Sequence, residues 1–231
     1  MKRTLSYGTK LIEYQLSFAD RKTLGITVTP ERKVVVVAPI GAAKSRINGI
    51  VMKRAQWILR QLDYFLAFYP KQQPKKYISG ESHLLLGRQY LLKCLPGNPE
   101  HVKLTARQII VTSRTKRRAK ELMHSWYAAK AKERLTDLVN EWIERLSSIQ
   151  KKPTSILVRT MTKRWGSCTA KGKIILNSEL IKAPRGCIDY VIVHELCHLI
   201  HHNHTIKFFE LQEELFPHWQ KWKIRLEHLL A

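Results

Sequence analysis

The most informative stretch of the sequence is Val191-Ile-Val-His194-Glu195-Leu-Cys-His198-Leu-Ile-His201-His202-Asn203-His204. It contains the pattern H-E-x-x-H. In a helix with 3.6 residues per turn, positions four apart lie about 40° apart around the axis. His194 and His198 therefore project from one face and can hold one metal ion, with Glu195 beside a metal-bound water.

A third histidine, His204, lies six residues after His198. About 600° of further helical rotation would turn its side chain away from the first two. A three-histidine site therefore requires the helix, predicted over residues 187–201, to end around residues 201–203 so that the chain turns back. Asn203 favours this ending, since Asn tolerates the left-handed conformation found at helix C-termini. Three histidines with an open water position are typical of catalytic zinc sites.

Other side chains near the motif are alternative ligands. His201 and His202 lie about one turn beyond the motif, and the next predicted helix carries three carboxylates, Glu210, Glu213 and Glu214. The plainest alternative is a solvated, histidine-rich helix face without a metal. Against it, the apolar run from Ile188 to Val193 predicts a buried helix, where an unpaired Glu is costly unless it has a role. The sequence therefore favours a metal site.

The whole chain is strongly basic. Its 231 residues include 41 Lys and Arg against 18 Asp and Glu, a formal net charge of +23. This charge predicts attraction to nucleic acid, nucleotides, anionic membranes or acidic proteins without choosing among them. The densest basic stretch, without one acid, comprises Lys103, Arg107, Arg114, Lys116, Arg117, Arg118 and Lys120. It is a candidate nucleic-acid surface, and a solvated strand end and helix start is the alternative.

The four cysteines do not form a disulfide framework. Cys94, Cys168, Cys187 and Cys197 include no C-x-x-C pair and fit a reducing compartment. No apolar run has the length of a membrane span, and the segment from Met1 to Gly8 lacks the apolar region of a signal peptide. These features predict a cytoplasmic protein without a transmembrane segment.

Hydrophobic periodicity predicts alternating β-rich and helical segments. Residues 10–40 read as three antiparallel strands, and residues 43–68 as a helix with a basic face. A second set of strands is predicted over residues 80–111. A long amphipathic helix follows over residues 117–147, and short strands over residues 155–181 precede the metal helix. This order of elements predicts an α+β fold.

We divide this fold into two domains. Residues 1–115 are predicted to form an N-terminal β-rich subdomain with a basic helix, and residues 116–231 a small α+β domain with a short antiparallel sheet and the metal-binding helix. Pro70 to Lys76 breaks the hydrophobic pattern and predicts a linker or a long loop.

The motif suits hydrolysis by a metal-bound water. Zinc lowers the pKa of that water to about 7, and the metal polarises a scissile carbonyl or phosphoryl oxygen. Glu195 takes the proton as a general base and returns it to the leaving group as an acid. The developing oxyanion needs a further donor. Candidates are Arg164, Trp165, Ser167 and backbone amides of the strand before the helix, and spacing does not rank them.

Residues around the motif extend the pattern. They are Arg164-Trp165-Gly166-Ser167-Cys168, Asn177, Pro184, Asp189-Tyr190-Val191 and Phe208-Phe209. With the motif, they resemble the YgjP-like metallopeptidase family, which is related to the SprT-like zincins. The N-terminal part matches more loosely, through Arg21 to Leu24, Val37 to Pro39 and Lys53 to Ile58. One departure is Phe209, where many relatives carry Trp.

The resemblance implies a small zincin fold with a long helix, a short antiparallel sheet, the metal helix and C-terminal helices. It implies His194, His198 and His204 as ligands of one zinc ion and Glu195 as the catalytic residue. It does not imply one substrate. SprT-like relatives act on DNA-associated proteins, whereas some YgjP-like members have been assigned as nucleoside-triphosphate pyrophosphohydrolases.

We therefore predict a zinc-dependent hydrolase, and a metallopeptidase first among such enzymes. One alternative is a metal-dependent nucleoside triphosphate pyrophosphohydrolase, because the same chemistry attacks phosphoryl centres. A second is a nucleic-acid-binding protein with a non-catalytic metal site. The intact Glu195 argues against that second alternative, since a structural metal site does not need this carboxylate.

Overall fold

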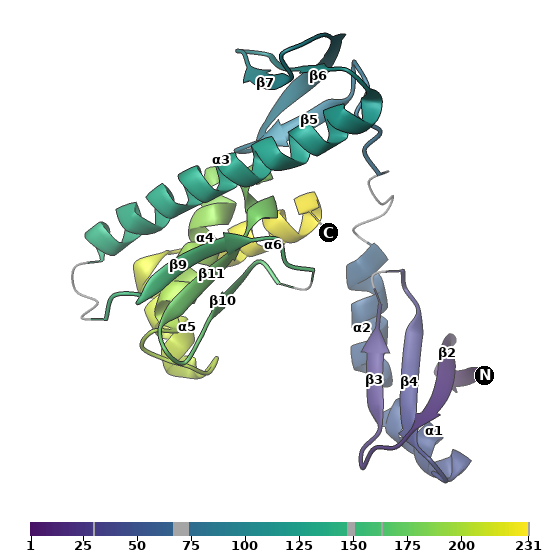
Figure 1. Cartoon of the computed structure of the whole chain (residues 1–231). Coiled ribbons are helices and arrows are strands. Elements are labelled where there is room, and N and C mark those ends of the chain that lie inside the picture. The colour runs from purple at the N-terminus through teal and green to yellow at the C-terminus, as the bar shows by residue number, and fades with distance from the viewer. Residues whose placement is uncertain (30, 67–73, 147–150, 163, 231) are drawn as a thin grey trace. The chain divides into compact units, whose positions relative to one another are not determined.

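The protein is mixed α+β, as predicted, with three small mixed sheets among the residues described (Figure 1). The computed structural model describes residues 1–29, 31–66, 74–146, 151–162 and 164–230. The chain forms two compact units, Met1–Gln72 and Gln73–Leu230. The predicted linker lies mostly outside the described residues. No described helix is long and apolar enough to cross a membrane.

The compact units divide at a different place from the predicted boundary after residue 115. The second set of strands belongs with the C-terminal unit. Its buried residues, such as Leu92, Ile109 and Val111, lie in one hydrophobic core with Met123 of the long helix that follows. A shared core joins these strands to the helix, although the composition of the sequence changes between them.

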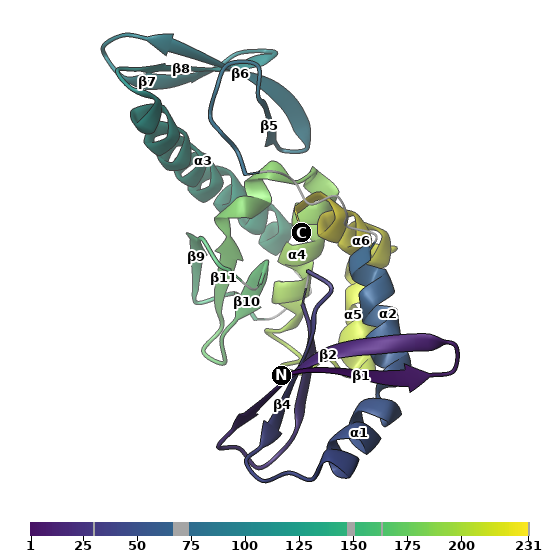
Figure 2. The ribbon, with the colours of Figure 1, turned by 90° about the vertical axis from the view of Figure 1, so that its right-hand side faces the viewer.

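The first unit is a four-stranded sheet with two helices. Its elements are β1 (Lys2–Tyr7), β2 (Lys10–Ala19), β3 (Gly25–Val28), β4 (Val34–Pro39), α1 (Lys44–Lys53) and α2 (Ala55–Leu66). The strand order is β1-β2-β4-β3, with β1 beside β2 at one edge (Figure 2). The prediction of three antiparallel strands was wrong, because β2 pairs with β4 in parallel. The apolar run Val34–Val37 takes an inner position, where strand neighbours protect it on both sides.

The second unit contains two sheets, four α-helices and one 3₁₀-helix in its described part. The first sheet has β5 (Ser82–Leu85), β6 (Arg88–Pro96), β7 (His101–Leu104) and β8 (Gln108–Ser113), in the order β5-β6-β8-β7. The second has β9 (Ser155–Arg159), β10 (Gly166–Cys168) and β11 (Lys173–Asn177), in the order β10-β11-β9. The helices are α3 (Lys116–Arg145), η1 (Ser178–Lys182), α4 (Arg185–Cys197), α5 (Ile206–Leu215) and α6 (Trp219–Leu230).

The sheet beside the metal helix was predicted to be antiparallel, but it is mixed. β10 and β11 form an antiparallel pair, but β9 pairs with β11 in parallel. A parallel neighbour needs a long crossover connection. Here β10 and its flanking loops provide that crossover and lie at the open edge of the sheet, so β10 has only one strand neighbour.

The long helix α3 supports both sheets and the metal helix (Figure 1). Its buried residues recur at helical spacing and include Met123, Leu135 and Trp142. The Trp142 indole N–H donates to Asp189 Oδ1 of α4 at 2.8 Å, and Arg185 Nε donates to the same oxygen at 2.7 Å. A buried carboxylate is thereby satisfied, and α4 is fixed against α3.

The β5–β6 turn fixes the start of α4. The backbone N–H groups of Leu86 and Gly87 donate to the carbonyls of Ile181 and Lys182, at 2.7 and 3.1 Å. Gly87 has φ +77°, and a Cβ added there would lie 2.7 Å from Cα of Pro184, the residue that precedes α4. Only glycine satisfies both the backbone angle and this close approach.

Gly87→Ala should lower the free energy of unfolding of the second unit by about 2–4 kcal/mol, through left-handed strain and overpacking on Pro184. Gly80→Ala is the matched control, because Gly80 has φ +88° and open space around it. It should lose only about 1–2 kcal/mol. Urea unfolding followed by tryptophan fluorescence measures the difference, since every tryptophan except Trp57 lies in this unit. Equal losses would contradict the packing argument.

Candidate metal centre

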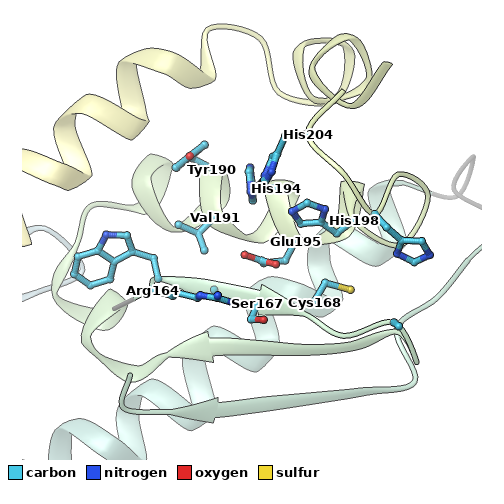
Figure 3. Close-up of a pocket in the computed structure, with 13 residues that line it drawn as sticks. Arg164, Ser167, Cys168, Tyr190, Val191, His194, Glu195, His198 and His204 are labelled. Carbon is cyan, nitrogen blue, oxygen red and sulfur yellow. Dashed lines mark hydrogen bonds between the residues drawn. The ribbon is translucent and has the colours of Figure 1, made fainter. Parts of the chain in front are cut away.

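Three histidines lie together at the C-terminal end of α4 (Figure 3). His194 is in the last turn of the helix, His198 caps it, and His204 lies on the segment that precedes α5. One ring nitrogen from each lies within 4.8 Å of the other two. The Nε2 atoms of His194 and His204 are 3.0 Å apart. Sequence spacing thus predicted a group that the fold does bring together.

This donor set fits zinc. Zn–N distances of about 2.0–2.1 Å in a tetrahedron place neighbouring nitrogens roughly 3.3–3.4 Å apart. The 3.0 Å between His194 and His204 is close to that value, and all three nitrogens lie within 4.8 Å of one another. Three nitrogen donors leave a fourth position open. None of the alternative ligands joins this group among the described residues. Those alternatives were His201, His202, Glu210, Glu213 and Glu214.

The helix ends earlier than predicted. α4 stops at Cys197, where we had placed the end around residues 201–203. Asn203 is not left-handed; among the described non-glycine residues only Arg32, Tyr77, Leu86 and His218 have positive φ. The physical reason is that other bonds close the turn. The N–H groups of residues 199 to 201 bond back to Leu196 and Cys197, and the His198 ring binds the His201 carbonyl, so no left-handed residue is needed.

Hydrogen bonds on the outer ring nitrogens orient two of the histidines. Nδ1 of His194 lies 3.0 Å from Oε1 of Gln212, and Nδ1 of His198 lies 3.0 Å from the His201 carbonyl oxygen. Both oxygens accept, so each Nδ1 carries the proton and each Nε2 turns its lone pair toward the shared centre. Such outer partners fix the tautomer of metal-binding histidines.

Gln212 is the residue that sequence reasoning missed. It is fully buried on α5, four residues after the buried Phe208. A glutamine on the apolar face of an amphipathic helix is uncommon and needs a partner. That position could have drawn attention to it, but only the fold shows that its partner is His194.

Two of the histidines, His194 and His198, are held in the neutral form that binds metals. Burial lowers the pKa of His194 to about 4, with the neighbouring His198 and His204 acting in the same direction. Burial also lowers the pKa of His198. Neutral imidazole offers a lone pair, whereas imidazolium does not. No proton therefore competes at these two positions near neutral pH.

Glu195 points from α4 toward β10, and its carboxylate is almost fully buried. The backbone N–H of Cys168 donates to it, while Oε2 has no partner in the described part of the chain. Burial raises its pKa to about 8, and Arg164 partly opposes that rise. An orphaned carboxylate oxygen is costly in a protein interior. Beside three converging imidazoles it indicates a site built for a cation and for proton transfer.

Gly166 makes room for this carboxylate. A Cβ added to Gly166 would lie 2.7 Å from Cγ of Glu195. Side chains alternate along a strand, so Gly166 faces α4 while Ser167 points to the opposite face of β10 and away from Glu195 (Figure 3). The candidate donors Arg164, Trp165 and Ser167 nevertheless all line the cavity over the site.

The cavity measures about 620 Å³ and lies between β10 and α4. Its lining residues are Arg164, Trp165, Gly166, Ser167, Cys168, Ala170, Tyr190, Val191, His194, Glu195, His198, His202 and His204. Tyr190 is a member that the spacing argument did not select. It precedes His194 by four residues and so shares its face of α4; that register is the signal that could have found it.

The basic stretch over residues 103–120 is partly neutralised in the fold. Arg118 binds Glu100 at 2.9 Å and Glu121 at 2.7 Å, and Arg117 binds Glu121 at 3.2 Å. Glu100 precedes the stretch and Glu121 directly follows it. Counting charges within the stretch alone therefore overstated its free positive charge. Nucleic-acid binding by this stretch stays a prediction.

The chain is similar to one protein family and to several solved structures. A family profile described as "YgjP-like, metallopeptidase domain" matches residues 22–229. No curated protein matches the chain. Among solved structures, the chain is similar to the metallopeptidase zymogen abylysin of Pyrococcus abyssi, with 22% identity over 40% of this chain and 94% of that one and a TM-score of 0.37. It is also similar to the metallopeptidase zymogen jannalysin of Methanocaldococcus jannaschii, with 27% identity, 40% and 91% coverage and a TM-score of 0.35.

His204→Ala should lower the amount of zinc retained after dialysis, because two histidines bind far more weakly than three. Elemental analysis of the purified protein measures this. Zinc content equal to that of the wild type would assign the third position to His201, His202 or a Glu instead.

Gln212→Leu should weaken zinc binding about 10- to 100-fold, because it removes the acceptor that orients His194. Gln212→Glu keeps an acceptor at the same place and should retain most of the affinity. Competition with a chelator measures both, and Gln220→Ala, a change at an exposed glutamine of α6, is the control. Equal affinities for the Leu variant and the wild type would show that Gln212 does not orient His194.

Proposed function

Because the chain belongs to the YgjP-like metallopeptidase family, we propose that it is a zinc-dependent peptidase whose ion is held by His194, His198 and His204. The observation that carries this proposal is the buried Glu195 carboxylate, with one unpaired oxygen, beside three converging imidazoles. Zinc bound there supplies a nucleophilic water near neutral pH and a Lewis acid for the scissile carbonyl.

In this proposal Glu195 moves the proton. Its carboxylate takes a proton from the attacking water and delivers it to the leaving nitrogen of the peptide bond. The Cys168 N–H binds the carboxylate, and Gly166 leaves room for it because it has no side chain. Because Glu195 is buried, bulk water does not compete for its oxygens, and a bound cation nearby would favour its charged, proton-accepting form.

The free edge of β10 supports a peptide as the substrate. β10 bonds to β11 through Trp165 and Thr169 at its two ends, so the backbone groups of Gly166 and Cys168 point away from β11. The Cys168 N–H is used by Glu195, which leaves the Gly166 amide and two carbonyls for a second chain. An extended peptide can add to such an edge as a further strand and pass over the three histidines.

The charge of the cavity also favours a peptide over a nucleoside triphosphate. Its lining contains one arginine, Arg164, and no lysine among the described residues. A triphosphate is usually held by several cations or a cradle of backbone amides. The excess positive charge of the chain lies elsewhere, so it does not make this cavity a phosphate site.

Glu195→Gln should keep its zinc and lose hydrolysis by at least about 10²–10⁴-fold, because the amide cannot accept the proton. Zinc-loaded wild type and variant are compared on casein-like peptides and, in parallel, on nucleoside triphosphates. Peptide cleavage that survives in the variant would contradict the role of Glu195. Turnover of the triphosphates alone would contradict the substrate class.

Gly166→Ala should likewise reduce peptide hydrolysis while zinc content is retained, since the added methyl group displaces the Glu195 carboxylate. We expect a loss of about 10²-fold, the scale for misplaced catalytic groups. Gly49→Ala, in open space on α1, controls for the substitution itself. Unchanged activity would show that β10 does not position Glu195.

A further inference from the structure

Glu195 accounts for the proton, but not for the charge that develops on the scissile carbonyl oxygen. A donor placed at that oxygen is usually worth several kcal/mol in the transition state. Three side chains were predicted for this role. Ser167 points away from Glu195, and Arg164 lies exposed with its charge beside Glu195. Trp165 lines the cavity, but among the described residues its ring contacts none of the three histidines, whereas the ring of Tyr190 contacts His194.

We propose that the hydroxyl of Tyr190 is the side-chain donor that binds this oxygen as its negative charge develops. The proposal rests on the proposed peptidase function and assigns one more catalytic residue to the same site. Tyr190 donates a hydrogen bond and exchanges no proton or electron pair with the substrate.

Tyr190 lies next to His194 on α4. It precedes His194 by one helical turn, so both side chains project from one face of α4 into the cavity (Figure 3). Their ring centroids are 5.9 Å apart. A carbonyl oxygen bound at the three histidines would therefore lie next to the tyrosine ring.

The hydroxyl of Tyr190 is available as a donor. Buried tyrosines normally find a hydrogen-bond partner for the hydroxyl. Here the hydroxyls of Tyr14, Tyr77 and Tyr127 bind Asn48, His124 and the Leu84 carbonyl. The Tyr190 hydroxyl has no such partner among the described residues, and it is not one of the polar atoms sealed from solvent. It is thus a donor without a partner, on a side chain that lines the cavity.

The ring of Tyr190 is held in place by stacking. It lies parallel to Trp219 of α6, at a centroid distance of 5.9 Å and an angle of 9°. Trp219 stacks on Phe209 at 5.7 Å, and Phe209 on His204 at 6.0 Å. This aromatic stack of four rings runs from the donor to the third histidine. A donor fixed before the reaction costs no reorganisation during it, and Trp219 is its positioning residue.

The corner between α5 and α6 fixes Trp219 in turn. His218 adopts φ +60°, a left-handed angle that is uncommon outside glycine. Its backbone N–H donates to Glu213 Oε1 at 3.1 Å. The indole N–H of Trp219 has no partner in the described part of the chain, so phenylalanine could replace it without the loss of a hydrogen bond.

Tyr190→Phe tests the donor, because it removes one oxygen and keeps the stack. In the zinc-loaded protein kcat on a casein-like peptide should fall about 10²–10³-fold, while KM and the zinc affinity stay close to wild type. Tyr77→Phe, which removes a hydroxyl far from the cavity, should leave all three unchanged. Unchanged kcat in Tyr190→Phe overturns the proposal, and so does a loss of zinc binding that accounts for the whole effect.

Binding of a phosphinic peptide gives a second measurement that does not depend on turnover. Its anionic tetrahedral centre resembles the transition state, so Tyr190→Phe should weaken its binding to the zinc-loaded protein about as much as kcat falls. If the wild type cleaves no peptide but binds the phosphinic peptide through Tyr190, the peptidase function fails and the donor assignment stands. Binding that is absent, or equal in both proteins, overturns the assignment.

Two changes at Trp219 separate positioning from packing. Trp219→Leu removes the stack and should lower kcat and phosphinic-peptide affinity together, about 10- to 100-fold, with zinc retained. Trp219→Phe keeps a stacked ring and should restore both. Equal behaviour of the two variants would show that the stack does not position Tyr190.

Discussion

The close approach of α4 to β10 is the constraint on which the site depends. Glu195 lies over a glycine because no other residue leaves room for its carboxylate. On its other side, α4 is tied to α3 through the buried carboxylate of Asp189, which Trp142 and Arg185 both bind. Because the helix is fixed on two sides, Glu195 faces the strand and the two histidines face the cavity.

What could be predicted from the sequence was mainly what is local. Helical geometry alone places His194, Glu195 and His198, and hydrophobic periodicity places α3 to within two residues. Strand pairing is not local, so the parallel pairs β2–β4 and β9–β11 and the shared core of β6, β8 and α3 were not visible. The role of Gln212 was not visible either, because its partner His194 lies eighteen residues away in the sequence.

The turn after α4 shows a subtler limit. Asn203 is a residue type that suits a left-handed helix ending, but the chain had another way to satisfy its carbonyls. A histidine ring binds the His201 carbonyl, and backbone bonds close the turn at residues 199 to 201. Residue preferences describe what a position tolerates, whereas the partners available in three dimensions decide which ending is used. The helix does end before His204, as predicted, but Asn203 is not left-handed.

The three histidines are not equivalent in how they are held. Two are fixed by hydrogen bonds on their outer nitrogens, whereas His204 sits on an exposed segment with its ring against Phe208 and Phe209. An ion bound by all three would act as a clasp between α4 and the chain that leads into α5. The aromatic stack that leads through Phe209 and Trp219 to Tyr190 begins at His204. Loss of the ion would therefore free the segment that carries His204, and with it one end of the aromatic stack that positions Tyr190.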